Sequence, residues 1–133
     1  MEKVKHIEIP LKEDERGWVV WPIENTELEK RRLCNVHLPF LRPGAVRGNH
    51  YHRKTIEYTL ILSGPTLAVF EDNRSGERKE ELIRGDRPVL FRIEADVTHA
   101  FKNQSPHAVY LLCYEQRDED HEEHDIYRKT ILL

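Results

Sequence analysis

Short segments rich in β-branched and aromatic residues follow one another along the chain, and turn residues separate them about every 8–12 positions. The clearest turn lies between Phe70 and Glu77, where Asn73 and Gly76 supply the positive φ that a tight hairpin needs. Only residues 24–31 show a weak helical pattern. This arrangement predicts an all-β sandwich or barrel of the jelly-roll type. The expected strands are Lys5–Ile9, Gly17–Pro22, Arg32–Leu38, Arg47–His52, Glu57–Leu62, Thr66–Glu71, Glu77–Leu82, Val89–Ile93, His99–Asn103, Val109–Tyr114 and Tyr127–Leu132.

Length and charge narrow the class of protein. A chain of 133 residues is long enough for one domain with a single core and too short for two ordinary ones, so a single domain over residues 1–133 is expected. The net charge of −3 argues against a nucleic-acid partner, because binding phosphates needs a concentrated basic surface. No apolar run approaches the ~20 residues of a membrane span, and the N-terminus lacks an apolar signal core. We therefore expect a cytoplasmic protein without a membrane partner, with Cys34 and Cys113 as buried free thiols.

Two of the expected strands, Glu57–Leu62 and Val109–Tyr114, carry apolar side chains on both faces. One face of each must line the interior of the barrel, so another part of the structure must cover the opposite face. The cover is either the N- and C-terminal arms or a second subunit. We expect a homodimer.

Two histidines and a carboxylate form the clearest chemical pattern in the sequence. His50 and His52 project from the same face of an expected strand, because side chains alternate with period two. After a polar turn, Glu57 opens the next strand and lies across from them, where an ionised carboxylate is costly to bury unless it is paired or bound to a cation. With His99 at the start of another apolar strand, the set suits one divalent transition metal such as zinc, iron, nickel, manganese or cobalt. The alternative is a hydrogen-bonded His–Glu pair without metal.

The stretch 44–64 resembles the first signature motif of the cupin superfamily, G-x5-H-x-H-x4-E-x6-G, at every defining position. Residues 85–103 resemble part of the second motif, because His99 and Asn103 keep its H-x3-N half. Glu94 and Asp96 stand where that motif usually has proline and glycine, which places two extra carboxylates near the mouth of the pocket. The resemblance implies a single-domain cupin jelly roll with His99 as the fourth ligand and a structural role for Asn103.

A nearer resemblance rests on Arg47-Gly-Asn-His-Tyr-His52 and on Glu13-Asp-Glu-Arg-Gly17. These stretches are similar to the C-terminal cupin domain of bacterial capsular polysaccharide enzymes that epimerise a UDP-4-keto sugar. They resemble more distantly the dTDP-4-dehydrorhamnose 3,5-epimerases and the dTDP-sugar ketoisomerases. The resemblance implies an epimerase or isomerase that acts on a nucleotide keto sugar in surface polysaccharide biosynthesis. In the metal-free relatives the histidine equivalent to His50 is the base, whereas the carboxylate at Glu57 favours the metal-dependent branch.

On this reading the metal polarises the keto group and a separate base moves a proton. The candidates for that catalytic base are Glu94, Asp96 and Tyr114. The candidates for substrate binding are Tyr58 and Arg47. Arg47 points away from His50 by strand alternation, although the resemblance implies a contact with the nucleotide diphosphate. A structural ion pair for Arg47 and simple packing for the two tyrosines remain as alternatives.

Two other functions stay open at this point. The same four ligands would suit an iron-dependent oxygenase, and the weakness of the candidate bases leaves room for a non-catalytic cupin that binds a sugar or another metabolite. His121 and His124 belong to a strongly acidic segment, which we interpret as a solvated loop.

Overall fold

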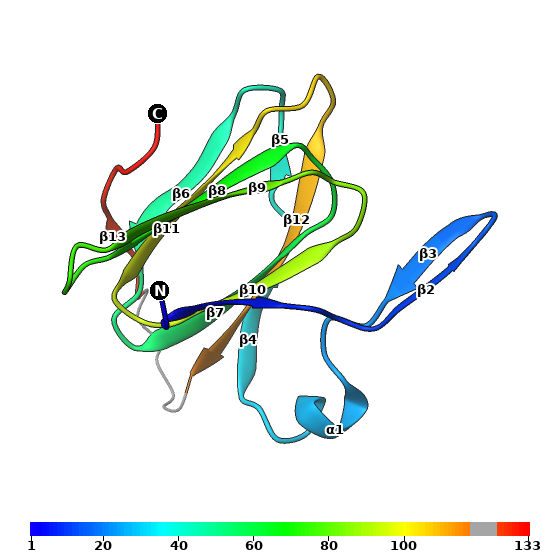
Figure 1. Ribbon diagram of the computed structural model, residues 1–133. Helices are drawn as coiled ribbons and strands as arrows, with labels where there is room; N and C mark the ends of the chain where they lie inside the picture. Colours follow the sequence, from blue (N-terminus) through cyan, green and yellow to red (C-terminus); the bar gives the residue numbers. More distant parts are fainter. Residues whose placement is uncertain (118–124) are drawn as a thin grey trace.

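Two antiparallel sheets face each other in the computed structural model, which describes residues 1–117 and 125–133 (Figure 1). The larger sheet has six strands in the order β1-β10-β7-β12-β4, with β5 paired to β12. Its strands are β1 (Val4–Ile7), β4 (Leu33–His37), β5 (Phe40–Leu41), β7 (Thr55–Ile61), β10 (Val89–Ile93) and β12 (Val109–Arg117). The smaller sheet has five strands in the order β13-β6-β11-β8-β9. Its strands are β6 (Val46–Tyr51), β8 (Thr66–Asp72), β9 (Arg78–Ile83), β11 (Val97–Asn103) and β13 (Tyr127–Arg128). The all-β jelly roll predicted from the sequence is confirmed.

The remaining elements lie outside this sandwich. The hairpin of β2 (Leu11–Asp14) and β3 (Gly17–Val20) projects from the body of the protein (Figure 1). The helix α1 (Asn25–Leu28) is a single turn, in line with the weak helical pattern. Within the described residues, no helix has the length and apolar composition that crossing a membrane requires.

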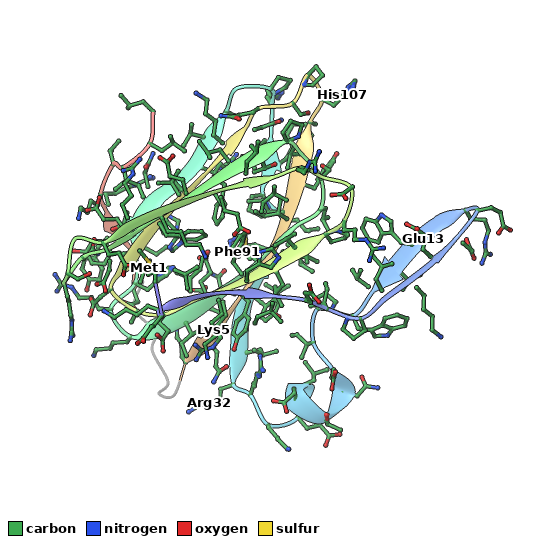
Figure 2. All side chains as sticks on the ribbon, viewed as in Figure 1. Met1, Lys5, Glu13, Arg32, Phe91 and His107 are labelled. Carbon is green, nitrogen blue, oxygen red and sulfur yellow. The ribbon has the colours of Figure 1, made fainter. Side chains whose placement is uncertain are left out.

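The main core fills the space between the sheets with inward-facing side chains. Ile61 and Leu111 come from the larger sheet, and Phe70 and Phe101 from the smaller one. Phe91 is fully buried among them (Figure 2). Each such aromatic or aliphatic side chain contributes about 1.5–3 kcal/mol when it is fully buried. This core occupies one part of the interior and leaves the neighbouring inward positions of β6, β7 and β11 to polar side chains.

The outer face of the larger sheet carries a second apolar cluster of Tyr58, Leu60, Leu90 and Tyr114. The N-terminal part of the chain covers this cluster with five side chains: Ile7, Ile9, Val20, Ile23 and Leu33. The terminal arm therefore supplies the cover that the sequence required over these residues, and the homodimer stays a prediction.

The C-terminal strand is shorter than the sequence suggested. The expected strand Tyr127–Leu132 is reduced to β13. The N–H of Lys129 still donates to the backbone carbonyl of Asn49 at 2.9 Å, and beyond Lys129 the backbone pairs with a side chain. The amide oxygen of Asn49 accepts hydrogen bonds from the N–H groups of Ile131 and Leu132, at 2.9 and 3.1 Å. The amide nitrogen of Asn49 donates to the carbonyl of Leu132 at 2.8 Å. One side chain thus ties the C-terminal segment to β6.

Candidate metal centre and its cavity

Four side chains from three strands and the turn after β6 converge in the interior. His50 belongs to β6, Glu57 to β7 and His99 to β11, and His52 follows directly after β6. One ligand atom from each lies within 4.8 Å of all the others. His52, Glu57 and His99 are 4, 5 and 1% exposed. His50 is the most open of the four, with 23% of its side chain exposed. The structure therefore brings together the four residues that the sequence singled out.

Hydrogen bonds at the far side of two imidazoles show which atoms face the centre of the cluster. Nδ1 of His52 donates to the carbonyl of Asp125 at 2.5 Å, and Nδ1 of His99 donates to the carbonyl of Val97 at 3.1 Å. A carbonyl oxygen only accepts, so each neutral ring carries its proton on Nδ1 and directs the Nε2 lone pair inward. Nε2 of His52 lies 3.1 Å from Oε1 of Glu57, and Nε2 of His99 lies 3.1 Å from Oε2. Nε2 of His99 is buried without a hydrogen-bond partner.

Lone pairs and carboxylate oxygens at such distances repel each other unless a proton or a cation lies between them. The donor set of three imidazoles and one carboxylate suits a divalent transition metal. Histidine ligands of metals also commonly donate the other ring N–H to a carbonyl or carboxylate, as His52 and His99 do here. The residues present therefore fit a metal ion.

The electrostatics of the cluster keep Glu57 ionised. Burial raises the pKa of this carboxyl, but when the imidazoles are protonated, the positive charge of His99 and hydrogen bonds from the three histidines outweigh burial, and the pKa lies well below its usual value. The pKa of His50 is lowered, chiefly by burial. Burial also acts to lower the pKa of His52, yet the hydrogen bond and charge of Glu57 prevail and raise it. The cluster is thus a buried anion that attracts positive charge.

Asp125 organises the turn between the second histidine and the carboxylate. Its carboxylate accepts hydrogen bonds from the N–H of Arg53 at 3.0 Å, the N–H of Lys54 at 2.7 Å and the hydroxyl of Thr55 at 2.9 Å. Its carbonyl orients His52, as described above. Asp125 is 7% exposed, although it follows directly after an acidic segment in the sequence. Sequence reasoning missed this residue, because nothing local distinguishes it from its acidic neighbours.

A bulge in β6 determines how the cavity above the cluster is lined. His99 pairs with His50 and Ala100 with Gly48, so Asn49 is an extra residue with a φ of 53°. An extra residue reverses the alternation of side chains, and Arg47 therefore lines the same cavity as His50. Strand alternation had predicted that Arg47 points away, and the bulge corrects that expectation.

The cavity has a volume of about 570 Å³, and its lining includes His50, Glu57 and His99. Arg47 and Arg128 contribute two cations to its lining. His37 and Cys113, which face each other across β4 and β12, line it as well. Sequence reasoning did not identify His37 or Arg128, because the position of each depends on strand pairing that no motif announces.

The other predicted catalytic carboxylates lie elsewhere. Glu94 and Asp96 line a separate surface depression, which corrects the expectation that they lie at the mouth of the metal cavity. The carboxylate of Glu94 is paired with Arg92 at 3.5 Å, and that of Asp96 with Arg74 at 3.1 Å. Asp96 takes a φ of 63° at the position where the second cupin motif usually has glycine, and its N–H donates to the carbonyl of His52 at 2.7 Å.

Tyr58 and Tyr114 point to the outer face of the larger sheet, away from Glu57. Their rings stack with centroids 4.9 Å apart, and each is 2% exposed. The hydroxyl of Tyr114 donates to the carbonyl of Pro22 at 3.0 Å. The structure does not bring either tyrosine to the metal cluster, because neighbouring residues of a strand face opposite sides of the sheet.

Two further expectations concern residues near the site. Asn103 is buried and donates from its amide to the carbonyls of Leu41 and His107, at 3.0 and 2.6 Å, which agrees with the structural role expected for it. His121 and His124 lie outside the described residues.

Comparisons with known proteins agree with this fold. The sequence profile of a family described as the polysaccharide biosynthesis C-terminal domain matches residues 12–127. A UDP-2-acetamido-2,6-beta-L-arabino-hexul-4-ose reductase from Pseudomonas aeruginosa is 22% identical over 124 residues, which cover 93% of this chain and 32% of the relative.

Two solved structures are similar in fold. The capsular polysaccharide assembling protein CapF from Staphylococcus aureus has a TM-score of 0.66 at 22% identity, over 93% of this chain and 35% of that one. The dTDP-6-deoxy-D-glucose-3,5-epimerase RmlC from Legionella pneumophila, in complex with dTDP-4-keto-L-rhamnose, has a TM-score of 0.77 at 22% identity, over 99% of this chain and 75% of that one. The chain thus spans about a third of the length of the reductase and of CapF. The solved structures agree with the jelly-roll fold, and the family match confirms the resemblance to the C-terminal domain of polysaccharide biosynthesis enzymes.

Proposed function

The chain belongs to the family of polysaccharide biosynthesis C-terminal domains, and on this basis we propose that it is a metal-dependent epimerase or isomerase of a nucleotide keto sugar. One observation carries the proposal. Two imidazoles whose Nδ1 protons are held by backbone carbonyls aim their Nε2 lone pairs at the buried carboxylate of Glu57, on the floor of an open cavity. Such an arrangement holds a cation beside a space where a small molecule fits.

His50, His52, Glu57 and His99 would hold the metal, which supplies a positive charge that polarises a substrate carbonyl group. Polarisation of a keto group makes the neighbouring C–H bond acidic, and this acidity is what epimerisation and ketoisomerisation require. The carbonyls of Asp125 and Val97 keep His52 and His99 in the tautomer that leaves Nε2 free to bind the metal.

The lining of the cavity supports a nucleotide sugar as the substrate. A volume of about 570 Å³ lies within the range of roughly 300–1,000 Å³ that is common for ligand sites. Arg47 and Arg128 place two guanidinium groups on its wall, and guanidinium groups suit the oxygens of a diphosphate. The similar RmlC structure contains dTDP-4-keto-L-rhamnose, a ligand of this chemistry.

The proposal is tested by proton exchange between the sugar and the solvent. Protein purified without an affinity tag is analysed for metal and is then incubated in D₂O with UDP- and dTDP-4-keto-6-deoxy sugars. We expect about one metal ion per chain and incorporation of deuterium beside the keto group. Glu57→Gln should lose both, whereas Arg128→Gln should keep the metal and bind dTDP more weakly.

Absence of exchange with all sugars tried, in protein that holds its metal, would refute the epimerase proposal. Iron-dependent consumption of dioxygen by the same protein would instead support the oxygenase that shares this ligand set.

A further inference from the structure

A bulge in β4 changes which of its residues faces the cavity. Cys113 pairs with His37, but Glu115 pairs with Cys34, so β4 holds one residue more than β12 between these two pairs. In a regular ladder Val36 would stand opposite Cys113. The extra residue instead brings His37 opposite Cys113, where it lines the cavity and stays exposed to solvent, and leaves Val36 67% exposed. β-Bulges re-aim side chains in this way and occur often beside active sites.

Asn35 holds the imidazole of His37 in a defined state. Asn35 lies within the bulge at a φ of 51°, and its side-chain amide donates to the buried carboxylate of Glu115. Its backbone carbonyl accepts a hydrogen bond of 2.7 Å from Nδ1 of His37. Because the carbonyl only accepts, Nδ1 carries the proton and Nε2 of a neutral His37 keeps a free lone pair. This lone pair is able to receive a proton.

The other groups that line the cavity are less suited to that task. Arg47 on β6 and Arg128 on β13 carry guanidinium groups, which offer hydrogen-bond donors and no acceptor. On β12, burial raises the pKa of the Cys113 thiol far above its usual value. Among the described residues of the cavity lining, His37 is the imidazole outside the metal cluster. An imidazole with a free Nε2 lone pair is the side chain that most often accepts a proton from a reacting group in enzymes.

We propose that His37 is the base that removes the proton next to the keto group of the substrate, an inference that rests on the function proposed above. The C–H bond breaks, its proton passes to Nε2 of His37, and its electron pair moves to the keto oxygen. Return of a proton from Nε2 to carbon restores a keto sugar, so no oxidant or reductant is consumed. Because the imidazolium proton exchanges with water, a cycle in D₂O leaves deuterium on the sugar.

The test compares His37→Gln with His107→Gln in the same exchange assay. His107 lies in an exposed turn away from the cavity lining and serves as the matched control (Figure 2). We expect His37→Gln to keep its metal and its affinity for dTDP, while the exchange rate falls about 100-fold or more. Imidazole added to His37→Ala should restore exchange in part.

An exchange rate of His37→Gln within a few-fold of the wild type would overturn the inference and leave the proposed function intact. Absence of exchange in the wild type and in His107→Gln alike would instead remove the proposed function, and the role of His37 with it. Loss of metal together with loss of exchange in His37→Gln would show a structural role and would also overturn the inference.

Discussion

Glu57 and Glu115 lie directly opposite each other in the β7–β12 ladder, and both are buried, at 5 and 1% exposure. Carboxylates in opposite positions on one face of a sheet repel each other unless positive charge compensates them. Glu115 accepts a hydrogen bond from the side-chain amide of Asn35. The guanidinium of Arg117 lies 3.5 Å from its carboxylate. Glu57 turns toward the three histidines. The metal proposed for the cluster would therefore also stabilise the fold.

Chelation should destabilise the wild-type protein, because the metal binds the folded state and not the unfolded chain. A metal present at 100 times its Kd stabilises the fold by about 2.7 kcal/mol. For a domain of this size, such a change lowers the Tm by roughly 5–15 °C on removal of the metal. Scanning calorimetry with and without chelator measures the shift. Glu57→Gln should show no chelator effect, and an unchanged Tm in wild-type protein of proven metal content would contradict this expectation.

Asp125→Ala should weaken metal binding although Asp125 is not a proposed ligand. The substitution removes the acceptor of three hydrogen bonds and leaves the N–H groups of Arg53 and Lys54 without partners, at a cost of about 2–4 kcal/mol. The turn that holds His52 then loosens, and metal affinity should fall about 10–100-fold. Competition with a chromophoric chelator measures the affinity, and urea unfolding measures the stability. Asp86→Ala, at an exposed site, is the control and should change neither. Equal metal affinity in both variants would show that the turn does not position His52.

The sequence predicted the fold and the convergence of three histidines and a glutamate because both depend on regular features. Alternation along β7 places Glu57 inward and Tyr58 outward, and the structure has them on those faces. His50, His52 and Glu57 lie close together in the sequence, so their pattern can be recognised without knowing which strands pair. His99 is distant in sequence, and the resemblance to the second cupin motif supplied it.

The rest of the site depends on departures from regularity. One extra residue in β6 turns Arg47 into the cavity, and one in β4 does the same for His37. A single-residue bulge reverses every alternation beyond it, and no side-chain pattern marks where it occurs. Asp125 depends on a long-range contact with the β6–β7 turn, which sequence periodicity does not contain.

Gly48→Ala should disrupt the pairing of β6 with β11 more than its small size suggests. A Cβ at this position would lie 2.6 Å from the carbonyl oxygen of His99, and the φ of 98° is unfavourable for alanine. Gly44→Ala measures the effect of the backbone conformation without the steric contact, because Gly44 has a φ of 78° with no atom within 4 Å of the added Cβ. We expect a loss of about 1 kcal/mol for Gly44→Ala and at least about 3 kcal/mol for Gly48→Ala. Only Gly48→Ala should also lose metal. Equal losses of stability in urea unfolding would show that the contact with His99 is relieved without cost.

Tyr114→Phe should affect stability and leave the metal cluster intact, because the side chain lies on the outer face of the larger sheet. It loses the hydrogen bond to the carbonyl of Pro22 and keeps the stacking on Tyr58. The expected loss is about 1 kcal/mol in urea unfolding, with unchanged metal content and unchanged exchange of sugar protons. A large fall in the exchange rate at constant stability would instead revive Tyr114 as a catalytic residue.

Asp72 should give the protein a measurable loss of stability in acid. Its carboxylate accepts hydrogen bonds from the N–H of Arg74 at 2.9 Å and from Lys3 at 3.0 Å. The first of these contributes most, and together they outweigh burial and lower the pKa to about 2 from an ordinary value of 3.8.

The folded state therefore favours the ionised form of Asp72, and its stabilisation is present above about pH 4 and lost as the pH falls toward 2. After allowance for solvent screening, this contribution amounts to about 1–2 kcal/mol. Urea unfolding of wild type and Asp72→Asn at several pH values measures it. The difference between the two proteins should be constant from pH 7 to 5 and should shrink between pH 4 and 2. Asp86→Asn should follow the wild type throughout, whereas a difference between wild type and Asp72→Asn that persisted undiminished at pH 2 would show that the stabilisation does not come from the ionised carboxylate.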